Sequence, residues 1–291
     1  MTHHYVVSHG VRDVVARLSS HIPASQIHVG APITALLPDQ DHPGRVTIAC
    51  SVGEGEGTTL HTGFEHVILA MQANHATSLV GAYARALEEQ EAFIAAERAA
   101  QLSECLSQFE YRQTVVVNHT DASLLPTDHR DRRDLNMVMF SSPLTRAKEQ
   151  LASAEPTGLL LPLTYAMTTQ ILPRPAGRAP GMAILQTTNP TVAPHPRSVL
   201  SVAHLERALL THAGKVAVRS LRADKDDMIG VGALQGTAKR ELGDNAVGLW
   251  VVGSYVHRGI PLLEGCVASA REIIERGVLK CEGASVHGSP W

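Results

Sequence analysis

The chain has 291 residues, of which 44% are hydrophobic and 18% are charged, and its formal net charge is −3. This composition excludes an intrinsically disordered chain, and the near-neutral charge gives no basic footprint for nucleic-acid binding. No stretch approaches the roughly 18 consecutive apolar residues that a membrane-spanning helix needs, so we expect no membrane span.

The N-terminal part combines one helix with several short strands. After Gly10, apolar residues recur at helical spacing as far as Ile22, and Pro23 ends the pattern. Alternating or apolar runs bounded by turn residues then predict strands at 26–29, 33–37, 45–51, 59–61 and 67–70.

The middle of the chain mixes helical and strand patterns. Residues 78–109 are rich in Ala, Glu, Gln and Leu and lack proline, so they form the strongest predicted helix region. Val202, Leu205 and Leu209 share one helical face ahead of Gly214, which predicts a helix over 201–213. Strands are predicted at 114–118, 135–140, 182–186 and 215–220.

A strand, a glycine turn and a helix are predicted near the C-terminal end. Residues 250–252 form a short apolar strand, and Gly253 permits a close approach of backbone to a ligand. Gly259 suits the N-cap and Pro261 the first turn of the helix that follows. Such a unit offers free backbone N–H groups and the positive end of a helix dipole to an anionic or electron-rich ligand.

The apolar residues of this last helix predict its buried face. Spaced along one side, they are Ile260, Leu263, Val267, Ala270 and Ile274. Gly277 is expected to end the helix.

This C-terminal segment resembles a known flavin-binding motif. Gly253-Ser-Tyr, followed by Gly-Ile-Pro-Leu-Leu-Glu-Gly-Cys-Val-Ala-Ser-Ala at 259–270, is similar to the C-terminal motif of the FAD-dependent amine-oxidase superfamily. Within it, the resemblance is closest to the predicted FAD/NAD(P)-binding oxidoreductases. Segments similar to that group follow in the same order at 64–76, 119–126, 131–136, 163–167 and 185–190, and the likeness spans about residues 5 to 277.

The resemblance implies an α/β fold with a partial, Rossmann-like FAD-binding layer and a mixed-sheet α+β substrate domain. The FAD-binding domain would comprise residues 1–80 and 246–291, and residues 81–245 would form the substrate domain. The implied activity is that of an oxidoreductase acting on a small organic substrate by hydride transfer to flavin. The implied cofactor-binding residues are Ile33 beside the adenine and, on the flavin side, Gly253, Ser254, Gly259, Ile260 and Glu264. No catalytic acid or base is implied.

The chain departs from that family at its N-terminal end. Intact members begin with a strand, a G-x-G-x-x-G turn and a helix, and nothing similar precedes Gly10. The glycine clusters at 53–57 and 230–236 lack the required spacing. The alternative hypothesis is therefore a truncated, non-catalytic remnant or binding module that needs a partner or a missing N-terminus. Exposed sheet edges would favour association as a homo-oligomer or with a completing subunit.

Other candidate sites are weaker. His119 and Asp121 are expected on one face of a strand and could form a proton-transfer pair, although a surface histidine or one satisfied by hydrogen bonds is the favoured interpretation. The sixteen histidines show no H-E-x-x-H or similar spacing, so we expect no metal site. Four widely spaced cysteines and the lack of a signal peptide indicate reduced thiols in a cytoplasmic protein.

Overall fold

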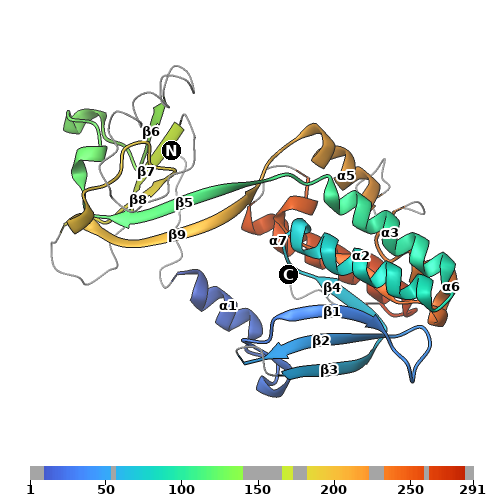
Figure 1. Cartoon of the computed structure of the whole chain (residues 1–291). Helices are drawn as coiled ribbons and strands as arrows, with labels where there is room; N and C mark the ends of the chain where they lie inside the picture. The colour runs from blue at the N-terminus through green and yellow to red at the C-terminus, as the bar shows by residue number, and fades with distance from the viewer. Residues whose placement is uncertain are drawn as a thin grey trace. The chain divides into compact units, whose positions relative to one another are not determined.

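The computed structural model describes residues 10–53, 57–139, 166–172, 182–222, 233–258 and 262–285. The chain divides into two compact units, each built from two separated stretches of sequence. The larger unit consists of Ile22–Tyr111 and Ala208–Trp291, and the smaller unit of Met1–His21 and Arg112–Arg207. Figure 1 labels the helices and strands.

A three-stranded antiparallel sheet opens the larger unit. Its strands are β1 (Ile33–Pro38), β2 (Val46–Val52) and β3 (Gly57–Phe64), with β2 in the middle, and they confirm the strands predicted there. The strand predicted at 26–29 is wrong. Ala24–Gln26 forms a 3-10 turn, and the residues from 21 to 30 are all exposed, so no neighbouring strand pairs with this segment.

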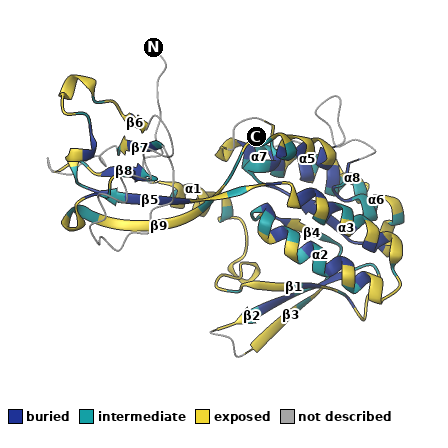
Figure 2. Cartoon of the chain, turned by 45° about the horizontal axis from the view of Figure 1, so that its top comes forward, coloured by how far each residue is buried: buried dark blue, intermediate teal, exposed yellow. Residues whose placement is uncertain are grey.

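The helical region predicted at 78–109 is two helices. α2 (Ala73–Glu89) and α3 (Phe93–Ser107) are joined by a turn in which Glu91 adopts a φ of 59°. The prediction of helix is confirmed. The break between the two helices occurs at Glu91, whose left-handed backbone was not predictable because the sequence has no proline or glycine there. Figure 2 shows buried residues along both helices.

Two parallel strands from opposite ends of the sequence pair beside these helices. β4 (His66–Leu69) runs parallel to β10 (Gly248–Val251), which confirms the strands predicted at 67–70 and 250–252. Alternate side chains of β10 enter two cores, one shared with α2 and α3 and the other centred on Trp250 and Ile273. Helices therefore cover both faces of the pair, as parallel strands require.

Further helices complete the larger unit. These are α5 (His212–Arg222), α6 (Thr237–Leu242) and α7 (Leu263–Glu272), which continues through a π-helical turn (Ile273–Val278) into α8 (Leu279–Cys281). The predicted end at Gly277 is wrong, because the helical backbone passes through this residue.

The buried face of α7 also differs from the predicted one. Leu263, Val267 and Ile274 are exposed, whereas Gly265 and Ser269 are buried. The periodicity identified a helix correctly, but two faces of α7 carry small or apolar residues. Contact with the segment after β10 selects the face with Gly265 and Ser269, because Gly265 lies against His257 and Ser269 bonds to Gly253.

The smaller unit contains a five-stranded sheet in the order β6-β7-β8-β5-β9. Its strands are β5 (Tyr111–His119), β6 (Leu135–Met139), β7 (Ala166–Ile171), β8 (Leu185–Thr188) and β9 (Val199–Ala208). The helix α1 (Val11–Ser19) also belongs to this unit and confirms the helix predicted after Gly10. None of its residues is buried.

The helix predicted at 201–213 and the strand predicted at 215–220 are both wrong. Residues 199–208 form β9, a largely exposed edge strand that pairs with β5, and residues 212–222 form α5. Val202 and Leu205 fit a helical face as well as an edge strand, so the long-range pairing with β5 decides the conformation. α5 buries Ala217, Val218 and Leu221 in the core with α2 and α3, which local strand propensity could not anticipate.

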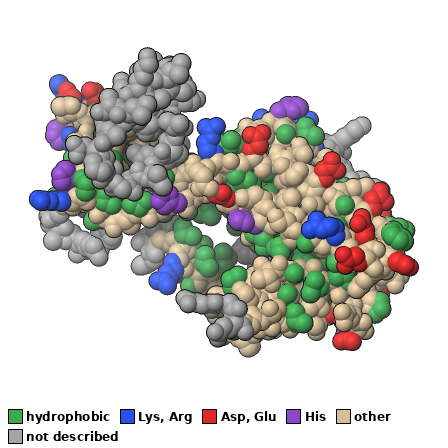
Figure 3. Space-filling view, viewed as in Figure 1, with side chains coloured by type: hydrophobic (Ala, Val, Ile, Leu, Met, Phe, Trp, Pro, Cys, Tyr) green, Lys and Arg blue, Asp and Glu red, His purple; other side chains and the backbone are tan. Residues whose placement is uncertain are grey.

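The chain is thus of the α/β class with mixed sheets, as predicted, whereas two parallel strands do not confirm a Rossmann-like layer. The chain passes between the two units at 21/22, 111/112 and 207/208, and α2, α3 and α5 pack in one core with the parallel pair. The expected division into cofactor and substrate domains at 80/81 and 245/246 stays a prediction. In the part of the chain that the structure describes, no helix combines the length and apolar character needed to cross a membrane. On the face shown in Figure 3, charged side chains are dispersed over the larger unit.

Candidate functional site

The carboxyl ends of β4 and β10 lie side by side, and a helix follows each of them. α2 begins at Ala73, after β4, and α7 begins at Leu263, after β10. In α/β proteins ligands bind in the crevice outside the carboxyl ends of parallel strands, where helix N-termini present free N–H groups. This end of the larger unit is therefore the candidate site.

Two tyrosine hydroxyls bond to backbone groups between the end of β4 and the start of α2. The Tyr111 hydroxyl accepts a hydrogen bond from the Ala73 N–H at 2.7 Å, and the Tyr255 hydroxyl donates to the Met71 carbonyl at 2.9 Å. Burial raises the pKa of the Tyr255 hydroxyl, so it remains a neutral donor. The first turn of α2 is thus occupied by protein groups, and the half at α7 remains for a ligand.

Gly253 holds the junction between β10 and α7. Its φ of 150° lies where residues with a Cβ are rare, and an added Cβ would lie 3.0 Å from the Tyr255 ring. Its N–H donates to the Ser269 hydroxyl at 3.0 Å, which ties the strand end to α7. The predicted importance of this glycine therefore has a local steric basis.

The first turn of α7 has polar groups to offer. Among the described residues no side chain caps it, because the N-cap position belongs to Leu262 and not to the predicted Gly259. The Gly265 N–H donates to the Leu262 carbonyl at 3.0 Å. The His257 ring packs against Gly265, and its Nδ1 atom is buried with no hydrogen-bond partner among the described residues. The N–H groups of the first turn could meet a ligand directly, whereas the buried Nδ1 could do so only after the side chains around it move.

The structure brings together only some of the sequence-predicted residues. Gly253 and Ser254 lie at the end of β10, and Glu264 lies exposed in the first turn of α7. Ile33 lies in a different sheet, in β1, whereas Gly259 and Ile260 are outside the described residues. The sequence reasoning missed His257, Ser269 and Tyr255. Two of them stand within four residues of Gly253, so their proximity to the turn was the available signal.

His119 is a satisfied structural histidine, as the favoured interpretation held. Its Nδ1 accepts a hydrogen bond from the Asp121 N–H, so Nε2 carries the proton and donates to the Thr187 hydroxyl at 2.7 Å. Thr187 is 2.8 Å from the Thr169 hydroxyl, and all three side chains are buried. Burial lowers the pKa of His119, and the Asp121 carboxylate serves other donors, so the two do not form a proton-transfer pair.

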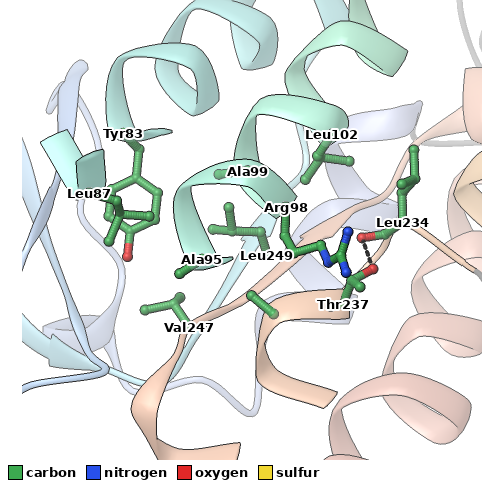
Figure 4. A pocket seen from close by; sticks show the side chains of 12 residues that line it. Tyr83, Leu87, Ala95, Arg98, Ala99, Leu102, Leu234, Thr237, Val247 and Leu249 are labelled. Atoms are coloured by element: carbon green, nitrogen blue, oxygen red, sulfur yellow. Dashed lines mark hydrogen bonds between the residues drawn. The ribbon is translucent and has the colours of Figure 1, made fainter. Parts of the chain in front are cut away.

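Two hollows lie away from the candidate site. Figure 4 shows the first, a cavity of about 20 Å³ between α2, α3, α6 and the start of β10, with room for about one water molecule. The second, of about 340 Å³, lies between the end of β1 and the end of α2 and is lined in part by Asp39, Asp41 and Glu89. Neither is lined by Gly253 or by a residue of α7.

Asp39 serves the sheet beside the second hollow. Burial alone would raise the pKa of its carboxyl group, but hydrogen bonds from the N–H groups of Gly63, Asp41 and His42 and from the His42 ring outweigh it and lower the pKa to about 2. Because the carboxylate is already saturated with donors, its role is structural.

Within the described residues no group of three or more histidine, cysteine or acidic side chains could hold a metal ion. No protein-family model matches the chain, and no curated protein matches its sequence. The features of the chain that bear on function are therefore the C-terminal motif and the geometry around Gly253 and α7.

Proposed function

We propose that the chain is an FAD-dependent oxidoreductase of the amine-oxidase type, acting on a small organic substrate by hydride transfer to flavin. The observation that carries the proposal is the N-terminus of α7, which no side chain caps among the described residues, next to the His257 ring at the carboxyl end of the parallel pair. The resemblance of the same segment to a flavin-binding motif supports it. When bound, the flavin supplies the acceptor for the hydride.

The described residues fit one part of FAD better than the other. The first turn of α7 suits the polar edge of the isoalloxazine, because no side chain caps its N–H groups in the part of the chain that the structure describes. The diphosphate needs a glycine-rich turn into a helix N-terminus. The turn after β4 is Ala-Met-Gln, and the helix it enters is tied to Tyr111, so the described residues do not provide this cradle.

The residues at the flavin side have defined tasks in this proposal. The positive end of α7 stabilises negative charge beside it, an effect worth about 0.3–1 kcal/mol at an exposed helix end and more when buried. His257 orients the ligand through Nδ1, and the hydrogen bonds of Ser269 to Gly253 keep α7 at the strand end. No described residue is assigned as a catalytic acid or base.

A second candidate function is favoured by one specific observation. β4 has a partner strand on one edge only, so the parallel sheet of the larger unit is unfinished within the described residues. A chain of this kind would act as a binding module that is completed by another polypeptide. It would bind FAD weakly or not at all on its own.

The test is a titration of the purified chain with FAD, followed by flavin absorbance and fluorescence. Replacing His257 by Phe keeps an aromatic side chain but removes both ring nitrogens, so we expect FAD binding at least about tenfold weaker, with a fold that remains intact by circular dichroism. The exposed His75, replaced by Phe, is the matched control. A wild-type chain that takes up no FAD would sink the first candidate, and an unaltered affinity of His257→Phe would refute the placement of the ligand.

We also propose a cytoplasmic location. All four cysteines are free thiols, and two of them, Cys50 and Cys105, are buried. Free thiols persist in reducing compartments. Fractionation of the cells that produce the protein tests this, and recovery outside the cytoplasm would contradict it.

A further inference from the structure

The two edges of the β4–β10 pair are treated differently. On the outer edge of β10, the Val251 N–H donates to the Gln235 side chain at 2.6 Å, and the Leu249 carbonyl accepts from the Gly236 N–H at 2.8 Å. On the outer edge of β4, among the described residues, no hydrogen bond reaches the Ile68 N–H. Because hydrogen bonding alternates along a strand, Ile68 and His66 direct their backbone groups outward. Within the described residues, the outer edge of β10 is therefore hydrogen-bonded to protein groups, whereas the outer edge of β4 has no partner strand. We call the latter the open edge.

The side chains next to the open edge are exposed and apolar. Ile68 is opposite Trp250 in the register and shares its face, yet Ile68 is 40% exposed and Trp250 is 0% exposed. α7 and its π-helical continuation cover this face, because Ala270 and Ile273 pack against Trp250. On its other side α7 exposes Leu263 by 68% and Val267 by 50%. An apolar helix stripe and an open strand edge together are features of interaction surfaces.

We infer that this surface is an interface between two copies of the chain. Two β4 strands would meet antiparallel across a two-fold axis, and the two α7 helices would lie on the same side of the joined sheet. The inference names the partner that the second candidate function requires, and it does not depend on flavin binding.

The charges of α7 favour a second copy as the occupant. Glu264 and Arg271 are two helical turns apart, and they flank the exposed Val267. Arg271 donates to Glu275 of its own helix through Nε at 2.8 Å, so a second carboxylate would be shared with this pair. An antiparallel crossing of two α7 helices at Val267 places Glu264 of each copy opposite Arg271 of the other. Two opposite-charge pairs thus frame an apolar contact, which is the self-complementarity that a two-fold interface needs.

The experiment is a measurement of mass by sedimentation velocity and light scattering, on the full chain without flavin. We expect a dimer of about 62 kDa, twice the 31.2 kDa of one chain. Val267→Lys should raise the dissociation constant of the dimer at least about tenfold. Val216 in α5 is 45% exposed, so Val216→Lys is the matched control and should leave the dimer intact.

A charge exchange tests the arrangement of the helices. Glu264→Arg should weaken the dimer, and the double variant with Arg271→Glu should restore it, because the pairs are rebuilt with opposite sign. The inference is overturned by a monomer at concentrations up to about 100 μM, by a dimer that survives Val267→Lys, or by a double variant weaker than Glu264→Arg. Each readout is a mass, so the interface is tested even in a chain that binds no FAD.

Discussion

Replacing Gly277 by Ala tests the packing of the core centred on Trp250 and Ile273. Gly277 lies within the π-helical turn, and an added Cβ would lie 2.5 Å from Cζ3 and 2.9 Å from Cη2 of Trp250. The indole has no room to retreat, because Gly236 and Gly248 border the same ring, and a Cβ on either would also lie within 2.7 Å of it. Its Nε1–H also donates to His66 Nδ1 at 3.0 Å, which fixes the orientation of the ring.

Two opposing terms set the size of the effect. Alanine is favoured over glycine inside a helix by about 1 kcal/mol. Overpacking a filled core costs about 1–3 kcal/mol, and the upper end applies where the side chain in the way is enclosed. The net expectation is a loss of about 2 kcal/mol in the free energy of unfolding of the larger unit.

The assay is urea unfolding followed by the fluorescence of Trp250. Trp291→Phe serves as the background, so that Trp250 is the sole reporter of the two tryptophans. Gly214→Ala in α5 is the control, because its nearest neighbour to an added Cβ is a hydroxyl at 3.3 Å. By circular dichroism, Gly277→Ala combined with Trp250→Leu should cost at least about 1 kcal/mol less than the two single changes added together. A Gly277→Ala protein as stable as the parent would refute the reasoning.

Two further predictions concern charges in the larger unit. Glu272→Gln removes the carboxylate that lies 2.8 Å from Nη2 of the buried Arg222, so we expect the free energy of unfolding in urea to fall by about 3 kcal/mol. The loss should be smaller when Arg222→Met is combined with Glu272→Leu, because no buried charge is then left without its partner. An unaltered urea midpoint for Glu272→Gln would contradict this expectation. Because the folded pKa of Asp39 is about 2 and its ordinary value is 3.8, its contribution is fully present above about pH 4 and is lost as the pH falls through 2. Asp39→Asn should therefore flatten the stability profile between pH 4 and 2, and a profile with the slope of the parent protein would count against this role.

Elements whose conformation rests on local pattern could be predicted from the sequence. β1, β2, β4 and β10 alternate or run apolar between turn residues, and all four form where the pattern placed them. β9 could not be predicted, because Val202 and Leu205 suit a helix equally well until β5 pairs beside them. Gly277 was mistaken for a helix end, since its actual reason is an indole 27 positions earlier in the chain, at Trp250.

In the candidate site, too, the features set by neighbouring residues could be predicted, and those set by distant residues could not. The strand, Gly253 and the helix after it followed from residues close together in sequence. The hydrogen bonds of Tyr111 and Tyr255 to the backbone after β4 join residues far apart in sequence, and periodicity carries no information on such contacts. The buried Nδ1 of His257 depends on the packing of its ring against Gly265, eight residues later, which only the fold defines.

The pairing of β4 with β10 sets the order in which the protein can assemble during synthesis. The indole of Trp250 reaches His66 across 184 residues, and the whole sheet of the smaller unit lies between them in sequence. That sheet pairs strands closer in sequence, so it can form while the ribosome is still translating the rest. β4 must wait with both edges unpaired until Gly248 to Val251 emerge, so the nascent larger unit is most vulnerable to misassembly in the interval before β10 is made.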